Sequence, residues 1–311
     1  MSEEGNINLL RILCLQAIRG VGPKTICSIL DSSVGLDGIF ERPEVLHDLK
    51  IRNKPEICTA LQESSLKTLM ESATSQLENC SKLGIQALSI SDDLYPPQLK
   101  RLDSPPIILY VQGDISLLKS KSVAIIGTRK ASELGLKINT ITTEHFCQEN
   151  FPIVSGLALG HDIHSHKITL EMGGKAIAVL ASLDQISPSA HVPFATKILE
   201  REGVLVSENP PERRVSNSDF IKRDRIQAGL SQAVFAIETT LDGGSMHAIH
   251  ASAKYQGKVY VPDFRPYVEK NFFGKLTPEI DGILELIKNN EAKPYTKDHL
   301  PMISQALRED N

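Results

Sequence analysis

The run Val123-Ala124-Ile125-Ile126-Gly127-Thr128-Arg129-Lys130 decides the fold, together with a second run, Pro152-Ile153-Val154-Ser155-Gly156. In each run a short apolar segment breaks at a glycine-bearing turn, and a helical pattern follows. Continuous apolar strands that alternate with helices indicate a parallel sheet covered on both faces. Glycine-bearing turns at the carboxyl ends of such strands open onto helix N-termini, which bind anions. The stretch 122–170 therefore predicts a Rossmann-like domain that handles a phosphate group.

Length and composition are those of an ordinary globular protein. The 311 residues suffice for one large domain and a smaller one, and the net charge of −4 leaves room only for a local basic groove. Five scattered cysteines without CxxC spacing are typical of reduced thiols in a cytoplasmic protein. No apolar run reaches the length of a membrane span, and the N-terminus lacks a signal-peptide pattern. We therefore expect a cytoplasmic protein with no membrane partner.

The chain divides by pattern into three regions. Residues 1–85 predict a small helical domain, residues 86–290 the Rossmann-like domain, and residues 291–311 a polar, loosely held tail. Strands are expected near 107–111, at the edge of the main sheet, and then near 122–126, 152–155, 176–180, 203–207, 233–237 and 258–261. Helices are expected near 133–149, 161–172, 191–201, 218–230, 245–256 and 278–290. This alternation predicts an α/β fold, with a mostly parallel sheet and helices on both faces.

Residues 18–25 resemble a helix-hairpin-helix motif. Pro23 suits the first turn of a helix, and the glycines before it suit a tight turn. The backbone amides of Gly20 and Gly22 and the side chain of Lys24 can meet a DNA phosphate without reading bases. A tight corner between two helices that only packs explains the same pattern. Both interpretations remain open.

Several segments at the expected rim of the sheet suit a phosphodiester chain. Such a ligand needs backbone amides, hydroxyls and basic side chains rather than catalytic carboxylates. All four segments follow strands, so in a parallel sheet they converge on one rim. The candidate contacts are Gly127, Thr128, Arg129, Lys130, Ser155, Gly156, Lys167, Lys222, Arg223, Arg225, Gly244 and Ser245. The alternative for Arg223 and Arg225 is a structural network with Asp219, Asp224 or Glu208.

An ordered series of segments resembles the DNA-processing protein A family (DprA, also called Smf). Each segment alone is weak evidence for the family. The ordered set, which covers about residues 7–263, is specific to it. The series comprises Tyr95-Pro96-Pro97, residues 109–114, residues 123–129, residues 155–158, Gly160 with Asp162 and His166, Ser207-Glu208 with Pro210-Pro211, Phe220 with Arg223 and Arg225, residues 228–231, and Gly244-Ser245.

The resemblance implies a Rossmann-like domain that binds and protects single-stranded DNA. It further implies a protein that helps to load a RecA-type recombinase, as in natural transformation, and that forms a homodimer. It implies no nucleotide hydrolysis and no cofactor. Two departures mark a divergent member: Leu159 stands where the family's second turn carries arginine, and Asp224 replaces an asparagine between two arginines.

Two rival functions share this kind of sheet. Phosphoribohydrolases of the lysine-decarboxylase-like (LOG) group carry a catalytic glutamate in a Gly-Gly-x-Gly-Thr-x-x-Glu turn, and His250 stands at that place here. We therefore expect that the chain is not an enzyme. A nucleotide-sensing or defence module on the same fold is the second rival, and Leu159 and Asp224 keep it open.

Histidines with helical spacing raise the question of a metal site. No HExxH motif and no matched cysteine set accompanies them, and the family pattern already accounts for two of the residues. We therefore expect no metal. The residues concerned are His161, Asp162, His164, His166, His247 and His250.

Overall fold

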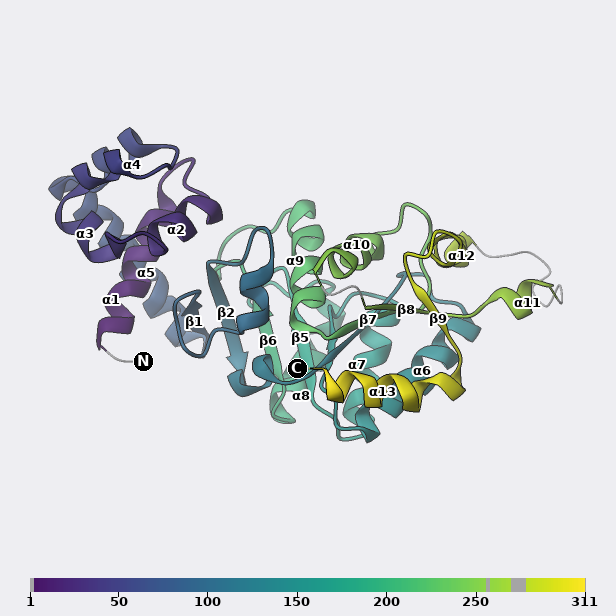
Figure 1. Ribbon diagram of the computed structural model, residues 1–311. Helices are drawn as coiled ribbons and strands as arrows, with labels where there is room; N and C mark the ends of the chain where they lie inside the picture. The colour runs from purple at the N-terminus through teal and green to yellow at the C-terminus, as the bar shows by residue number, and fades with distance from the viewer. Residues whose placement is uncertain (1–2, 256–257, 270–277, 311) are drawn as a thin grey trace. The chain divides into compact units, whose positions relative to one another are not determined.

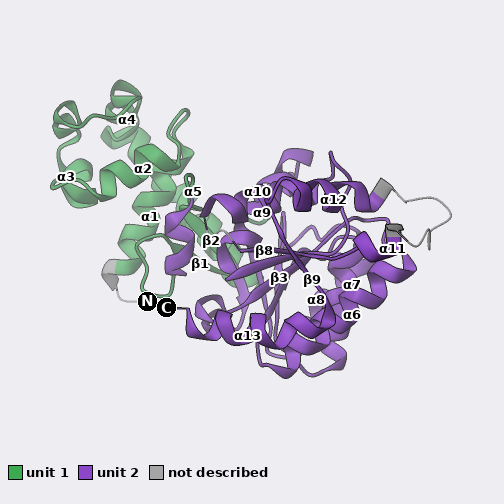
Figure 2. Ribbon diagram, turned by 45° about the vertical axis from the view of Figure 1, so that its right-hand side comes forward, with its two compact units in different colours: residues 1–95, 103–110, 208–211 green, residues 96–102, 111–207, 212–311 purple. Residues whose placement is uncertain are grey.

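The computed structural model describes residues 3–255, 258–269 and 278–310, which divide into two compact units (Figure 2). The first unit takes residues up to 95 together with 103–110 and 208–211, and the second takes the remainder. The first unit thus extends beyond the predicted break at residue 85. Backbone pairing explains the extension, because the amide of Ile90 donates to the carbonyl of Ile107 at 2.9 Å.

Helices dominate the first unit, as the sequence predicts. A stripe of apolar side chains on the first helix, among them Leu9, Ile12 and Leu13, is buried, because residues at this spacing share one helical face. Gly20 joins the first two helices at φ +84°, where a Cβ would lie 2.7 Å from the Asn53 side-chain nitrogen. The elements are α1 (Glu3–Ala17), α2 (Pro23–Leu30), α3 (Gly35–Glu41), a 3-10 helix (Pro43–Asp48), α4 (Lys54–Ala60), α5 (Glu63–Lys82) and β1 (Gln86–Ser89).

Strands and helices alternate in the second unit, which confirms the predicted α/β class. Its strands are β2 (Ile108–Gly113, which begins in the first unit), β3 (Val123–Ile126), β4 (Ile153–Ser155), β5 (Ala176–Val179), β6 (Val204–Ser207), β7 (Ala233–Ala236), β8 (Val259–Pro262) and β9 (Lys293–Tyr295). Its helices are α6 (Glu133–Gln148), α7 (His161–Glu171), α8 (Val192–Glu200), α9 (Asn217–Leu230), α10 (Ser245–Tyr255), α11 (Arg265–Glu269), α12 (Asp281–Lys288) and α13 (Leu300–Glu309). Short 3-10 helices lie at Pro97–Arg101, Ile115–Lys119, Ser189–His191, Pro278–Ile280 and Lys297–His299.

After β2, the strands of the second unit run in the order β6-β5-β4-β3-β7-β8-β9, and all neighbours in this order are parallel. Val123 of β3 is in register with Ile153 on one side and Ala233 on the other. Helices α9, α10 and α12 cover one face, and α6, α7, α8 and α13 cover the other (Figure 1). Burial on both faces explains why the strands are apolar throughout rather than alternating.

Strand β2 is not the edge strand that the sequence predicts. Strand β1 pairs with it and lies outside it in the strand order. The sequence of β1 does not say where in the sheet it pairs, because register and neighbours come from tertiary packing.

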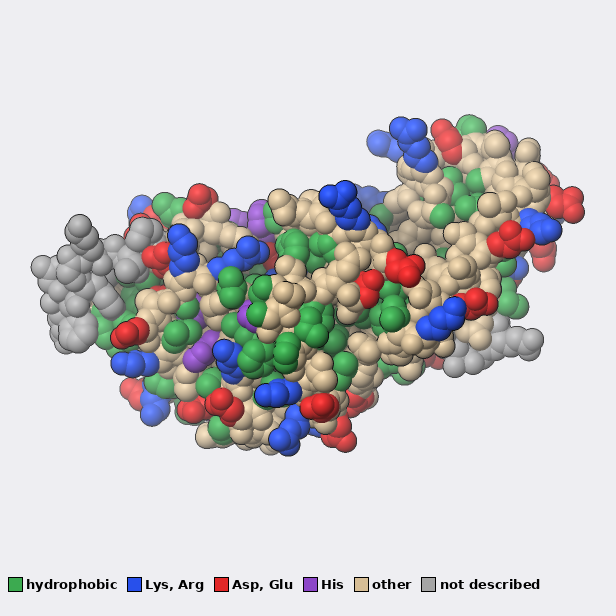
Figure 3. Space-filling view, turned by 180° about the vertical axis from the view of Figure 1, so that it is seen from behind, with side chains coloured by type: hydrophobic (Ala, Val, Ile, Leu, Met, Phe, Trp, Pro, Cys, Tyr) green, Lys and Arg blue, Asp and Glu red, His purple; other side chains and the backbone are tan. Residues whose placement is uncertain are grey.

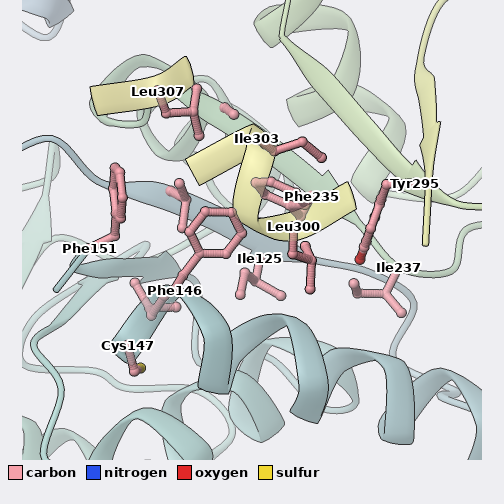
Figure 4. Close-up of a cluster of buried hydrophobic side chains, with 13 residues drawn as sticks. Ile125, Phe146, Cys147, Phe151, Phe235, Ile237, Tyr295, Leu300, Ile303 and Leu307 are labelled. Atoms are coloured by element: carbon pink, nitrogen blue, oxygen red, sulfur yellow. The ribbon is translucent and has the colours of Figure 1, made fainter. Parts of the chain in front are cut away.

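Residues 291–310 are not a loosely held tail, so this prediction is wrong. Strand β9 pairs with β8, and Leu300, Ile303 and Leu307 of α13 join Phe146 in a buried cluster (Figure 4). The hydroxyls of Tyr295 and Thr142 lie 2.8 Å apart inside it. The helical spacing of Leu300, Ile303 and Leu307 indicates an amphipathic helix. The average composition of the segment does not show this, because charged residues lie around the apolar ones.

Two surface properties agree with the sequence. None of the helices in the described ranges combines the length and the apolar character needed to cross a bilayer. On the side seen in Figure 3, basic and acidic side chains are interspersed, and hydrophobic ones gather near the middle. This mixture fits the small net charge of −4.

Candidate functional site

The candidate site is a cavity of about 450 Å³ in the second unit, at the carboxyl ends of β3 and β7. These two strands are neighbours, and the chain leaves them toward opposite sides of the sheet. Such a topological switch point is where open α/β sheets bind ligands. Phe220, Ile221 and Ala248 are among its apolar lining residues, and its polar lining comes from the turns after both strands and from α7 and α9.

Backbone hydrogen bonds hold the turn after β3 from two sides. The amide of Thr128 donates to the carbonyl of Glu238 at 2.8 Å, and the carbonyl of Thr128 accepts from the amide of His161 at 3.4 Å. The amide of Lys130 donates to the Thr128 hydroxyl at 3.2 Å. The side chains of Arg129 and Lys130 are exposed and line the cavity. The turn therefore presents two cations from a fixed backbone.

Beneath this turn, the carboxylate of Glu238 fastens the start of α6. It accepts from the amide of Ser132 at 2.9 Å and from the ring of His161 at 2.9 Å, and the Ser132 hydroxyl donates to it as well. Ser132 also caps α6 by accepting from the amide of Gly135. Burial favours a raised pKa for Glu238, but the hydrogen bonds from His161 and Ser132 outweigh it and lower the pKa. Glu238 thus holds residues 128 and 132 at once, through its backbone and its side chain.

Two glycines make this close packing possible. A Cβ on Gly127 would lie 2.4 Å from a carbon of the His161 ring, and one on Gly135 would lie 2.2 Å from a carboxylate oxygen of Glu238. Neither neighbour has room to give, because the His161 ring is itself held by Asn139 at 3.1 Å and by Glu238. Any side chain at these positions would displace the turn or its support.

The turn after β4 is covered rather than exposed. The Ser155 hydroxyl donates to the carbonyl of Ile125 at 2.7 Å, and the Gly156 carbonyl accepts from the Arg223 guanidinium. Ser155 and Gly156 are both buried, whereas Leu159, further along the turn, is 52% exposed. Here the strand end serves as support for the cavity and not as its surface.

Arg223 of α9 is buried and connects several strand ends. Its guanidinium donates to the carbonyls of Gly156 and, at 2.9 Å, of Val179, so it ties the ends of β4 and β5 together. It also lies 3.5 Å from the Asp162 carboxylate and 3.6 Å from that of Asp224. The side chain is 8% exposed, and its contact with Asp224 realises the Arg223 part of the structural-network alternative. Asp219 instead forms the capping box of α9 with Ser216.

The structure brings seven of the twelve predicted rim contacts together around the cavity. These are Gly127, Thr128, Arg129, Lys130, Arg223, Gly244 and Ser245. Two further lining residues, Thr239 and Thr240, were missed by sequence reasoning. They follow β7 directly, so the rule that polar residues after a parallel strand gather at one rim would have found them.

The other five predicted contacts do not line the cavity. Ser155 and Gly156 lie beneath it, and Arg225 is half-buried on α9. The ammonium of Lys222 lies 3.9 Å from Asp219, and that of Lys167 lies 5.1 Å from the Phe194 ring centre. In the first unit, Gly20 and Lys24 are exposed and Gly22 precedes α2.

The histidines have separate surroundings. His161 pairs with Glu238, the His164 ring lies 2.8 Å from the Thr140 hydroxyl, and His166 is buried. Across the described ranges, no three His, Cys, Asp or Glu side chains gather in a way that would hold a metal ion. His250, which stands where the LOG group carries its catalytic glutamate, is exposed on α10, 3.8 Å from Glu291, and does not line the cavity.

Comparison with known proteins points to one family. A family model described as DNA recombination-mediator protein A matches residues 86–304. DNA processing protein DprA of Bacillus subtilis is 33% identical over 189 residues, which cover 59% of this chain and 63% of that protein. Protein Smf of Escherichia coli is 37% identical over 155 residues, which cover 50% of this chain and 41% of that protein. The matched part therefore spans less than two thirds of either relative.

Solved structures agree on the fold. DprA of Streptococcus pneumoniae matches with a TM-score of 0.74 at 24% identity, over 97% of this chain and 98% of that chain. DNA processing protein A of Helicobacter pylori matches with a TM-score of 0.61 at 26% identity, over 73% of this chain and 97% of that chain. The structure of the latter was described for its single-stranded DNA binding mode.

Proposed function

We propose that this chain, which belongs to the family of DNA recombination-mediator protein A, binds single-stranded DNA at the cavity between β3 and β7. The observation that carries the proposal is the turn at residues 127–130. Backbone hydrogen bonds hold this turn, and it presents Arg129 and Lys130 to the cavity. A phosphodiester chain is recognised by such basic side chains together with backbone amides and hydroxyls.

The shape of the site favours a single strand over a duplex. A recessed cavity of about 450 Å³ admits one segment of a flexible strand, whereas a stiff duplex cannot bend into it at small cost. The single-stranded DNA binding mode described for the Helicobacter pylori relative supports the same ligand class.

Fluorescence anisotropy with labelled oligo-dT tests the proposal. The double variant Arg129→Ala, Lys130→Ala is expected to bind at least tenfold more weakly and to lower the slope of log K against log salt by about 1.4, or about 0.7 for each lost phosphate contact. The matched control is Lys175→Ala, Arg201→Ala, which removes the half-exposed Lys175, paired with Glu202, and the exposed Arg201, both beside the amino ends of β5 and β6. Equal weakening in both variants, or no binding by the parent at low salt, would refute the proposal.

The resemblance extends the proposal to partners. The chain would protect single-stranded DNA in the cytoplasm as a homodimer, without catalysing a reaction on it, and would help to load a RecA-type recombinase during natural transformation. The test measures ATP hydrolysis by a RecA-type protein on oligo-dT that a single-strand-binding protein already covers. The quantity of interest is the lag before hydrolysis begins. Addition of the chain is expected to shorten this lag. An unchanged lag with intact DNA binding would remove the loading role alone.

A further inference from the structure

Two buried carboxylates share one guanidinium at the floor of the cavity. Arg223 lies 3.5 Å from Asp162 and 3.6 Å from Asp224, and these carboxylate side chains are only 8% and 14% exposed. Part of the guanidinium is already used, because it donates to the carbonyls of Gly156 and Val179. With both carboxylates ionised, this group of three carries one excess negative charge in a place where water is scarce.

The other charged groups near the pair do not remove this excess. Arg129, which lines the cavity with an exposed side chain, opposes the rise in the pKa of Asp224 without cancelling it. On α7, His161 is hydrogen-bonded to Glu238, and burial lowers the pKa of His166 to about 4, so that its ring is neutral. Glu279, which also lines the cavity, adds an acidic group.

We propose that binding of a phosphodiester group in this cavity is coupled to the uptake of one proton by the Asp162–Asp224 pair. The inference rests on the function proposed above and adds its regulation by pH. A phosphodiester has no proton to share, so an ionised carboxylate beside it repels it. A protonated carboxyl removes the excess charge and offers an O–H donor.

The surroundings make such a proton available near neutral pH. Burial raises the pKa of Asp224, Arg223 opposes the rise, Asp162 adds to it and Arg129 opposes it, with a result of about 7. Burial also raises the pKa of Asp162, and the opposing effects of Arg223 and His161 do not cancel this rise. The two groups interact, so the proton belongs to the pair rather than to one residue.

The sign of the effect follows from linkage. Below the pKa of the empty site, the pair already holds its proton, and affinity does not change with pH. Above it, each binding event must take a proton from solution, so affinity falls by up to about tenfold for each pH unit. Binding is therefore strongest on the acidic side of neutrality.

The experiment measures the affinity of the full chain for oligo-dT from about pH 6 to pH 9 at constant ionic strength. The parent is expected to lose up to about tenfold per pH unit above about pH 7. Asp224→Asn leaves one carboxylate with one guanidinium, so its affinity is expected to be independent of pH and to exceed that of the parent at least tenfold at about pH 8.5. Asp242→Asn, which removes an exposed charge from the turn before α10, is expected to keep the pH dependence of the parent.

Calorimetry of the parent provides a second measurement that needs no variant. At about pH 8, the binding enthalpy in buffers of different ionisation enthalpy is expected to report the uptake of about one proton. A parent whose affinity is independent of pH, a zero proton count, or an unchanged slope in a folded Asp224→Asn would each overturn the inference while DNA binding stands. No binding at any pH would instead refute the proposed function, and with it this inference.

Discussion

The turn after β3 presents its basic side chains to the cavity, whereas the turn after β4 is covered by Arg223. Both turns follow short buried strands, and both contain glycine. In the first, glycine lets a strand end pack against His161 and Glu238 while Arg129 and Lys130 stay exposed. In the second, Gly156 makes room for a guanidinium that belongs to the protein itself. A glycine-bearing strand end can therefore stay open to the cavity or be filled by a cation of the protein itself, depending on what packs over it.

Removal of Arg223 is expected to have the largest effect. Arg223→Ala would leave Asp162 and Asp224 buried without their cation and would free two backbone carbonyls. Loss of one partner from a buried ionic group costs about 3–5 kcal/mol. Urea unfolding followed by circular dichroism at about pH 8 measures this cost. Arg129→Ala on the exposed turn is the control and should change the unfolding free energy by less than about 0.5 kcal/mol. Similar losses of unfolding free energy in the two variants would show that the two turns do not differ in this way.

A methyl group on the covered turn is expected to come next. A Cβ on Gly156 would lie 2.4 Å from a guanidinium nitrogen of Arg223, so Gly156→Ala should destabilise the protein by about 1–3 kcal/mol through overpacking. Gly244→Ala, at a lining position with nothing within 4 Å of the new Cβ, is the matched control. A Gly156→Ala protein as stable as the control would mean that the second turn is not filled as described.

Loss of the hydrogen bonds to the Glu238 carboxylate, below the exposed turn, is expected to have a smaller effect on the free energy of unfolding, and this effect should depend on pH. Glu238→Gln removes the charge of the carboxylate that accepts from Ser132 and His161. This change should lower the free energy of unfolding by about 1 kcal/mol at about pH 7. Because the pKa of Glu238 is lowered in the folded state, its contribution is present above the unfolded value of about 4.3 and is lost as pH falls through the folded value. Unfolding at about pH 7 and about pH 3 should therefore show the difference between parent and variant shrinking with acid. A constant difference would contradict the role of the charge.

The smallest effect is expected outside both turns. Lys167 lies over the Phe194 ring and does not line the cavity. Lys167→Ala should change the affinity for oligo-dT by less than about twofold, because a cation away from the strand contributes only a screened field. A loss as large as that of Arg129→Ala would extend the interface along α7.

Part of the candidate site could be predicted from residue types alone. Arg129, Lys130 and Gly244 follow strands, and parallel strands bring their carboxyl ends to one rim, so their meeting needs no knowledge of side-chain packing. Arg223 carries the same kind of side chain as Arg129, yet α9 is packed so that its guanidinium faces inward. A sequence pattern does not distinguish the two, since the difference lies in which face of the helix the neighbouring strands cover.

The sequence by itself determined the α/β class, the alternation of apolar strands and helices, and the rim where the polar turns gather. These follow from local rules: the period of the apolar residues, the conformational freedom of glycine and the direction of parallel strands. Only the tertiary structure decided that α13 completes a buried core, that Ser155 and Gly156 lie beneath the surface, and that two carboxylates share Arg223. Such facts depend on contacts between residues far apart in the chain, whose burial and charge balance exist only once the sheet and its helices have packed together.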